Sequence, residues 1–225
     1  MEGVGGGVMR IAFVTQGSLS VFKEMSFYEE SDITIFGFNG VGEVSYQKEL
    51  KGETAFFEDA AKLSKRDKNI LVFGCVTDTL GHKRKSVSVA DNGRLLGVSD
   101  MLYAVDGECS AGASMKMYET KIGKMGVVVA GDLLFPETVK ALALCGSEFV
   151  VCPFDKAVTP LERAYICVYA HTYGLPIFLC GDEFCMVASP KGEIVFSSPH
   201  SPVVATYDVK REYHLVERRL ARRLL

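Results

Sequence analysis

The chain has 225 residues, of which 48% are hydrophobic and 24% charged, and its formal net charge is −3. This composition is typical of a soluble globular protein, and the length allows one sizeable α/β core or two small domains. The slight negative charge gives no electrostatic reason to expect a nucleic-acid partner. No apolar run approaches the roughly 20 residues that a membrane span requires, so no membrane association is expected. Residues 1–9 are glycine-rich and lack the apolar core of a secretory signal, so we expect a flexible leader.

The seven cysteines indicate reduced thiols rather than a disulfide framework. Their number is odd, most lie inside apolar segments, and none shows the paired spacing or the histidine partners of a zinc site. We therefore expect a cytoplasmic protein, in which disulfides rarely persist, with neither metal nor cofactor. Cys180 and Cys185 form the only close pair, and two core cysteines on neighbouring strands are favoured over a redox pair.

Apolar runs of strand length recur along the chain. The segment 69–75 is almost continuously apolar, as in a strand covered on both faces. The segment 86–90 leads into Asn92-Gly93, the dipeptide of a tight hairpin turn, and Lys83-Arg84-Lys85 before it is expected to be a solvated hairpin edge. The expected strands cover residues 10–15, 32–38, 69–75, 86–90, 95–98, 116–119, 124–129, 149–152, 177–180, 185–188, 193–197 and 203–208.

Helical periodicity and end signals predict fewer helices than strands. Residues 53–65 place their apolar side chains on one helical face. Residues 136–145 begin with proline and glutamate and stop before a glycine. Residues 159–173 begin with threonine and proline, as an N-cap and first turn, and a glycine C-cap follows them. A short helix is also expected at residues 19–28.

The order of these elements predicts one domain. Strands and helices alternate without a linker-like change in composition or an internal repeat. Residues 10–209 are therefore expected to form one α/β domain, with two mixed β-sheets between helical layers, because the strands are too many for one small sheet. Residues 210–225 are expected to form a basic helical tail, whose leucine-bearing face suits an interface better than a phosphate-contacting patch.

The segment 123–137 carries the clearest functional pattern. Its apolar run, Val127-Val128-Val129, ends in Ala130-Gly131-Asp132 and continues to Phe135-Pro136-Glu137. A strand that ends in a tight turn at the rim of a sheet commonly displays a reactive side chain. The residue at this turn is an alanine.

This segment resembles the nucleophile motif of the nitrilase, or carbon–nitrogen hydrolase, superfamily, in which a strand ends Cys-x-Asp and continues to Phe-Pro-Glu. Further motifs follow in the family's order, so the resemblance covers residues 10–215; they are residues 92–97, 146–153, Arg163-Ala164 and 189–194. The resemblance implies an α/β fold, the nitrilase-like four-layer αββα sandwich with two mixed β-sheets.

The family hydrolyses nitriles or amides with a Glu–Lys–Cys triad, in which a thiolate attacks, a carboxylate moves protons and an ammonium stabilises the oxyanion. The resemblance assigns the cysteine position to Ala130, the lysine position to Met101 and the glutamate position to Phe38. None of these side chains performs that chemistry, so a pseudoenzyme that binds a ligand or a partner is expected. The three side chains are expected to converge at one end of the sheets, and a small neutral ligand is expected because no fixed charge replaces the lost ones.

The alternative is an amidase-type hydrolase of non-peptide carbon–nitrogen bonds with a displaced nucleophile. Cys152 ends a strand close to the expected site, and Glu108 or Asp132 could serve as its base. A core cysteine is favoured over such a site. A solvated loop carboxylate is favoured for Glu108, while Asp132 and Glu137 are expected to hydrogen-bond backbone near the turn and the helix start.

The resemblance also implies an assembly. Family members pair through the helices after the nucleophile strand and after the next strand, which correspond here to residues 136–145 and 159–173. Tyr165, Tyr169 and Tyr173 form a row on the second helix, and tyrosines are enriched at interfaces. A two-fold homodimer through these helices is therefore expected, with the tail bracing the contact.

Overall fold

A computed structural model gives the structure of the protein and describes residues 7–22, 31–38, 40–104, 107 and 109–208. The tail expected at residues 210–225 lies outside the described residues. The first strand begins at Val8, inside the expected leader, because Val8 and Met9 pair with Asp208 and Tyr207 of the last strand.

Two mixed β-sheets form the centre of the molecule. The first contains β1 (Val8–Val14), β2 (Ile33–Phe36), β3 (Glu43–Ser45), β4 (Ile70–Thr79), β5 (His82–Asp91), β6 (Arg94–Asp100) and β13 (Val203–Asp208). The second contains β7 (Met117–Thr120), β8 (Gly123–Val127), β9 (Phe149–Ala157), β10 (Ile177–Asp182), β11 (Cys185–Ala188) and β12 (Ile194–Ser198). The strand orders are β13-β1-β2-β4-β5-β6, with β3 also paired to β4, and β12-β11-β10-β9-β8-β7.

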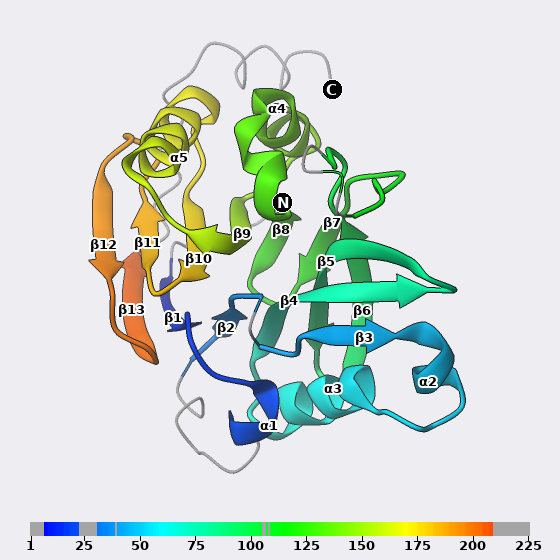
Figure 1. Ribbon diagram of the computed structural model, residues 1–225. Coiled ribbons are helices and arrows are strands. Elements are labelled where there is room, and N and C mark those ends of the chain that lie inside the picture. Colours follow the sequence, from blue (N-terminus) through cyan, green and yellow to red (C-terminus); the bar gives the residue numbers. More distant parts are fainter. Residues whose placement is uncertain (1–6, 23–30, 39, 105–106, 108, 209–225) are drawn as a thin grey trace.

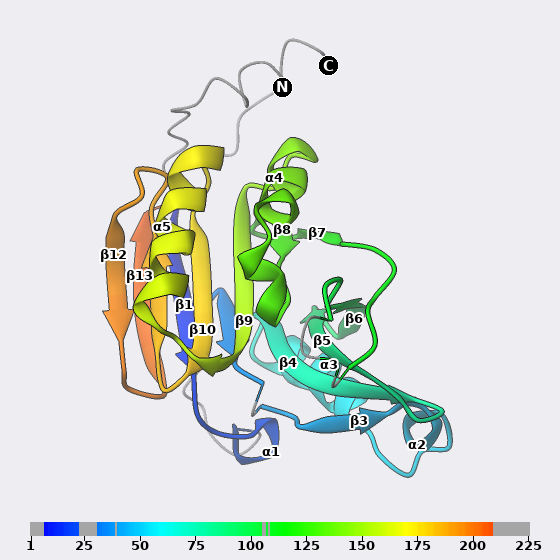
Figure 2. The same ribbon diagram turned by 45° about the horizontal axis from the view of Figure 1, so that its top comes forward.

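Helices cover the outer faces of both sheets (Figures 1 and 2). α4 (Pro136–Leu144) and α5 (Pro160–Tyr173) lie on one side of the molecule, and α1 (Leu19–Phe22), α2 (Tyr46–Leu50) and α3 (Phe56–Arg66) lie on the other. One apolar cluster fills the space between the sheets, a second lies under α4 and α5, and a third lies under α3. The expected four-layer αββα sandwich with two mixed sheets is therefore confirmed.

The parallel strands of both sheets bring their carboxyl ends together. β1, β2 and β4 are parallel in the first sheet, and β8, β9 and β10 are parallel in the second. The Cys180 thiol lies 3.3 Å from the Ile35 carbonyl oxygen of the facing sheet, and the Gln16 amide donates to Glu183 at 2.9 Å. Ligands of α/β proteins commonly bind beyond the carboxyl ends of the strands, so a functional site is expected at this end of the molecule.

Local signals placed several elements correctly. The Thr159 hydroxyl accepts from the Leu161 N–H and Glu162 accepts from the Thr159 N–H, which together form a complete capping box for α5. Gly174 ends α5 in the left-handed conformation, with φ +63°. The hairpin between β5 and β6 turns at Asn92, with φ +47°, and at the glycine that follows.

The helix expected at residues 53–65 begins instead at Phe56. The two N–H groups at its start donate to the Glu49 carboxylate of α2, at 3.1 and 3.3 Å. Because the capping acceptor comes from a neighbouring helix, the local sequence does not mark this start. The short β3 and α2 had not been expected.

Candidate functional site

The turn after β8 places Ala130 at the centre of the candidate site. Ala130 opens a short 3-10 helix, η1 (Ala130–Leu134), with φ +46° and a completely buried side chain. A residue other than glycine in this conformation carries a cost of about 1–3 kcal/mol and persists only where its surroundings hold it. The expected sharp turn is present, and its side chain is a methyl group packed in the inter-sheet cluster.

Asp132 holds this turn to the segment that follows β6. Its buried carboxylate accepts hydrogen bonds from the backbone N–H groups of Leu102, at 2.9 and 3.0 Å, and of Tyr103, at 2.9 Å. Burial raises the pKa of Asp132, and the same two backbone donors oppose that rise. The expected backbone role of Asp132 is confirmed, and the carboxylate oxygens are engaged by the chain itself.

Glu137 lies at the start of α4, where it accepts from the Tyr103 hydroxyl at 3.3 Å. The Tyr103 ring stacks on Phe135, with ring centroids 3.9 Å apart. Glu137 therefore contacts a side chain, whereas a backbone hydrogen bond had been expected. Together with Asp132, it fastens residues 102–103 against the turn.

Met101 occupies the position that the resemblance assigns to the lysine. It is buried in the inter-sheet cluster, and its backbone N–H donates to the Lys85 carbonyl oxygen at 2.8 Å. A Cβ added at Gly131 would stand 3.7 Å from the Met101 sulfur, so Met101 lies against the turn that carries Ala130. Its thioether offers packing contacts and no charge.

Phe38, at the position assigned to the glutamate, is half-buried and packs against the same cluster. Its ring lies over Gly74 of β4, where an added Cβ would stand 2.5 Å from the ring. Only glycine leaves room for the ring there. Phe38, Met101 and Ala130 thus all lie in or against the inter-sheet cluster.

A buried ion pair lies beside these positions. The Lys85 ammonium of β5 is 2.8 Å from the Asp155 carboxylate of β9, in the other sheet. Ser86 pairs with Asp100 across β5 and β6, so Lys85 stands opposite Met101 with its side chain on the same face. A fixed positive charge therefore lies one strand away from the lysine position, where no charge had been expected.

The expected solvated edge at residues 83–85 is wrong for Lys85. Lys83 is exposed and Arg84 half-buried, whereas Lys85 is buried together with Val87 and Val89. The strand begins at His82, so the alternation of side chains points Lys85 between the sheets. That alternation, extended backwards from the two valines, was the signal that could have found it.

Comparison with solved structures decides the fold. An amidase from Nesterenkonia sp. has 17% sequence identity and a TM-score of 0.73, over 99% of this chain and 98% of that chain. A carbon-nitrogen hydrolase from Helicobacter pylori G27 has 16% identity and a TM-score of 0.74, over 96% and 92%. Saccharomyces cerevisiae Nit3, a member of branch 10 of the nitrilase superfamily, has 16% identity and a TM-score of 0.72, over 89% of this chain and 90% of that chain. The fold is the nitrilase fold.

At the level of sequence, neither family models nor curated proteins produce a match. The similarity of three-dimensional structure, at sequence identities of 16–17%, therefore shows the fold alone. It shows the nitrilase fold and leaves activity to be argued from the residues.

Cys152, the alternative nucleophile, is completely buried in this nitrilase fold. It packs in the cluster beneath α4 and α5, whereas Ala130 packs between the sheets. Burial raises the pKa of the Cys152 thiol, with a smaller contribution from Asp132. These are the properties of an unreactive core thiol. Glu108, one of its two expected bases, lies outside the described residues.

Cys180 and Cys185 stand opposite each other on β10 and β11, as expected for core cysteines on neighbouring strands. Both are completely buried free thiols. Burial raises the pKa of Cys185 to about 12 and that of Cys180 well above its ordinary value. Over the described ranges, no group of three or more His, Cys, Asp or Glu side chains is placed to hold a metal ion. Among the described helices, none is long and apolar enough to cross a membrane.

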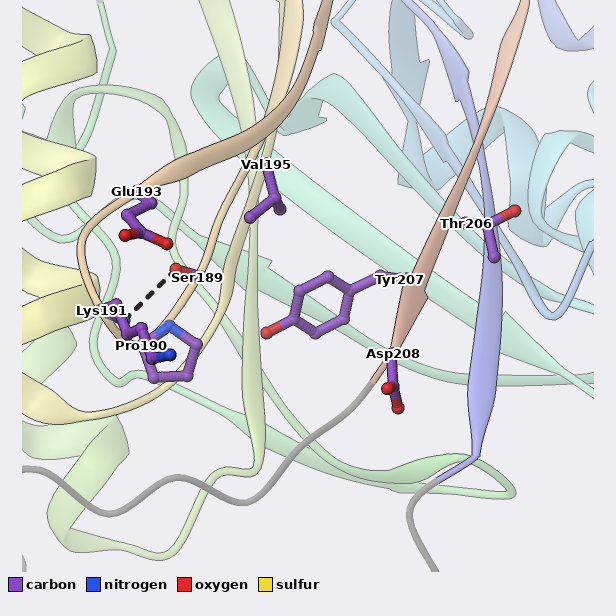
Figure 3. Close-up of a pocket in the computed structure, with 8 residues that line it drawn as sticks. All are labelled: Ser189, Pro190, Lys191, Glu193, Val195, Thr206, Tyr207 and Asp208. Atoms are coloured by element: carbon purple, nitrogen blue, oxygen red, sulfur yellow. Dashed lines mark hydrogen bonds between the residues drawn. The ribbon is translucent and has the colours of Figure 1, made fainter.

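A hollow of about 290 Å³ lies near the amino-terminal ends of β1 and β10, because Asp208 pairs with Val8 and Ala188 with Ile177. It is bounded by the β11–β12 turn and the end of β13, which pairs with the start of β1. Figure 3 shows the Tyr207 ring pointing toward Pro190 and Lys191 across it. It contains none of the positions that the resemblance assigns to the triad.

Proposed function

We propose that this nitrilase-fold protein is catalytically inactive and acts by binding a ligand or a partner. The observation that supports it is Ala130. The turn that would present a nucleophile is built, strained and held by Asp132, yet it carries a buried methyl group. Met101 and Phe38 at the other two positions likewise offer neither an ammonium nor a carboxylate. Differential stabilisation of a transition state needs such groups, whereas binding does not.

A substrate screen tests this proposal. The purified chain is incubated with amides, nitriles, ureido compounds and esters, and products are measured by mass spectrometry. We expect no product above that of a heat-denatured sample. Turnover that disappears in a Cys152→Ser variant, with turnover retained in Cys167→Ser as the matched control, would instead establish the displaced nucleophile.

We also propose that two copies pair through α4 and α5. Leu144, Leu161 and Val168 expose apolar side chains on these helices, and exposed apolar patches commonly mark contacts between proteins. Tyr169 does not belong to this surface, because it is buried against the second sheet.

Light scattering at micromolar concentration tests the assembly. We expect twice the chain mass for the unaltered protein and the single chain mass for a Leu161→Glu, Val168→Glu variant. Ile194→Glu, Val195→Glu on the edge strand β12 serves as the matched control, since both side chains are exposed there. A single chain mass for the unaltered protein would refute the pairing.

All seven cysteines lie in the described part of the chain, and each is a free thiol. This supports a reducing location, and we propose the cytoplasm.

A further inference from the structure

The hollow of about 290 Å³ lies between the edge strands of the two sheets. β12 is an edge strand of the second sheet and β13 an edge strand of the first, and Figures 1 and 2 show them side by side. Ala188 of β11 pairs with Ile194. Val187, the residue before it, pairs with Phe196, so Val195 is the extra residue of a bulge in β12. Bulges re-aim side chains and are common beside functional sites, and Val195 lines the hollow with half of its surface exposed.

Tyr207 forms a rigid wall of the hollow. Only 7% of this residue is exposed, and its ring meets Phe178 edge-on, with the ring centroids 5.7 Å apart. Figure 3 shows the ring pointing across the hollow toward Pro190 and Lys191. Because the core already holds the ring, a ligand does not have to order it. Tyr207, Pro190 and Val195 together offer a ligand a fixed apolar surface.

Ser189 and Glu193 place polar groups beside that apolar surface. The Ser189 N–H donates to the Glu193 carbonyl oxygen at 2.9 Å, so the two residues lie side by side at the β11–β12 turn. The Ser189 hydroxyl accepts from the Lys191 N–H at 3.3 Å, and only 8% of Ser189 is exposed. Within the described part of the chain, the proton of this hydroxyl has no acceptor and the Glu193 carboxylate has no donor. A nearly buried hydroxyl without an acceptor is costly, so a bound molecule that accepts from it is expected.

The rim of the hollow carries charges of both signs. Lys191 is basic, Glu193 and Asp208 are acidic, and all three are exposed. An anion would lie beside the two carboxylates and a cation beside the ammonium, and like charges placed together oppose binding. A neutral ligand avoids both conflicts. Hydroxyl groups suit such a ligand because each donates and accepts, so one can accept from Ser189 while the next donates to Glu193.

Resting on the proposed binding function, we infer that this hollow binds a neutral cyclic polyol, of the class of free monosaccharides. Such a ring has an apolar face, which packs against Tyr207, Pro190 and Val195. It also has a rim of neighbouring hydroxyls, which meets Ser189 and Glu193. The volume of the hollow is close to the lower limit of small-molecule sites, about 300 Å³, which suits one sugar ring rather than a chain of them.

Direct binding measurements on the unaltered chain test this inference. Sugars at high concentration stabilise proteins by being excluded from their surface, so binding is titrated by saturation-transfer NMR rather than by thermal unfolding. Glucose, galactose and myo-inositol are the neutral probes. Glucosamine and glucuronate carry the glucose ring with one positive or one negative charge, and cyclohexanol lacks the neighbouring hydroxyls.

We expect saturable binding of at least one neutral polyol, and dissociation constants at least about tenfold higher for glucosamine, glucuronate and cyclohexanol. The absence of saturable binding for all three neutral probes would overturn the inference. Binding of a charged analogue or of cyclohexanol as tight as that of the neutral polyols would overturn it too.

Three variants locate the binding. Val195→Trp places a large side chain in the hollow and should abolish saturable binding. Ile194→Trp is the matched control, because Ile194 is 47% exposed against 50% for Val195 and does not line the hollow. Binding that survives Val195→Trp, or that is lost equally in Ile194→Trp, would overturn the site. Ser189→Ala should weaken binding roughly three- to tenfold, the loss of one hydrogen bond, and unchanged binding would overturn the choice of a polyol.

The same samples separate this inference from the proposed function. Chemical conversion of a probe, detected by mass spectrometry, would refute the non-catalytic proposal and leave the polyol site standing. The absence of both binding and conversion would refute the polyol site and leave the non-catalytic proposal standing.

Discussion

Lys83 and Lys85 of β5 each form an ion pair with a carboxylate, and the two pairs differ in their burial. Lys85 points between the sheets and meets Asp155 at 2.8 Å, whereas Lys83 meets Glu43 at 2.6 Å with about half of each side chain exposed. In water the second pair gains little, because solvent screens both charges. In the interior, solvent screens the charges of the first pair much less. Both lysines lie on the same face of β5, so it is their position along the strand, and not the alternation of side chains, that separates the exposed pair from the buried one.

The largest effect is expected for Lys85→Met alone. It leaves the Asp155 carboxylate nearly buried without its ammonium, and breaking a buried pair typically costs about 3–5 kcal/mol. Chemical denaturation of the variant should show that loss. If the variant is as stable as the original chain, the ion pair is exposed to solvent.

A second, smaller effect concerns the carboxylate that holds the turn. Asp132→Ala leaves the N–H groups of Leu102 and Tyr103 without their acceptor in the interior, which we expect to cost about 1.5–3 kcal/mol. Glu137→Ala removes an exposed carboxylate from the first turn of α4 and is the control. Water can replace its contact with the Tyr103 hydroxyl, so the unfolding free energy should change little. Equal losses in both variants would contradict the role assigned to Asp132.

The stability of the chain should also report the ionisation of Asp132. Burial raises its pKa above the ordinary 3.8, so the folded state holds this proton more tightly than the unfolded state. The protonated Asp132 side chain therefore contributes to the free energy of unfolding in full below pH 3.8. This contribution is lost as the pH rises through the raised pKa of the folded state. Asp132→Asn should remove this part of the pH dependence of unfolding. An unchanged pH profile would contradict the claim that burial raises the pKa of Asp132.

Ala130 and Lys85 show which features of the structure the sequence predicts and which it does not. The turn at Ala130 and the bounds of β11 and β13 follow from local patterns, because apolar alternation and turn residues act over a few positions. The partner of Lys85 lies 70 residues further along the chain, in another sheet. No local pattern encodes such a contact, and it depended on β5 beginning earlier than the apolar run suggests.

The next effect tests the packing beside the buried pair. Gly74→Ala would place a Cβ 2.5 Å from the Phe38 ring, and overpacking of this kind typically costs about 1–3 kcal/mol. Gly131→Ala is the matched control, since its Cβ would meet the Met101 sulfur at an ordinary 3.7 Å. Combining Gly74→Ala with Phe38→Leu should recover part of the loss in denaturation measurements. Absence of any recovery would place the Phe38 ring elsewhere.

The smallest effect is expected for Lys83→Met, the exposed counterpart of Lys85→Met. Glu43 raises the pKa of Lys83, first through the hydrogen bond and then through its charge, but solvent remains available to both partners once the contact is lost. The unfolding free energy of this variant should therefore stay within the error of denaturation measurements, at low and at high salt alike. Lys83→Met and Lys85→Met are the same substitution on the same strand, so a difference between their unfolding free energies reports the difference in burial. A loss at Lys83 as large as that at Lys85 would mean that burial does not distinguish the two pairs.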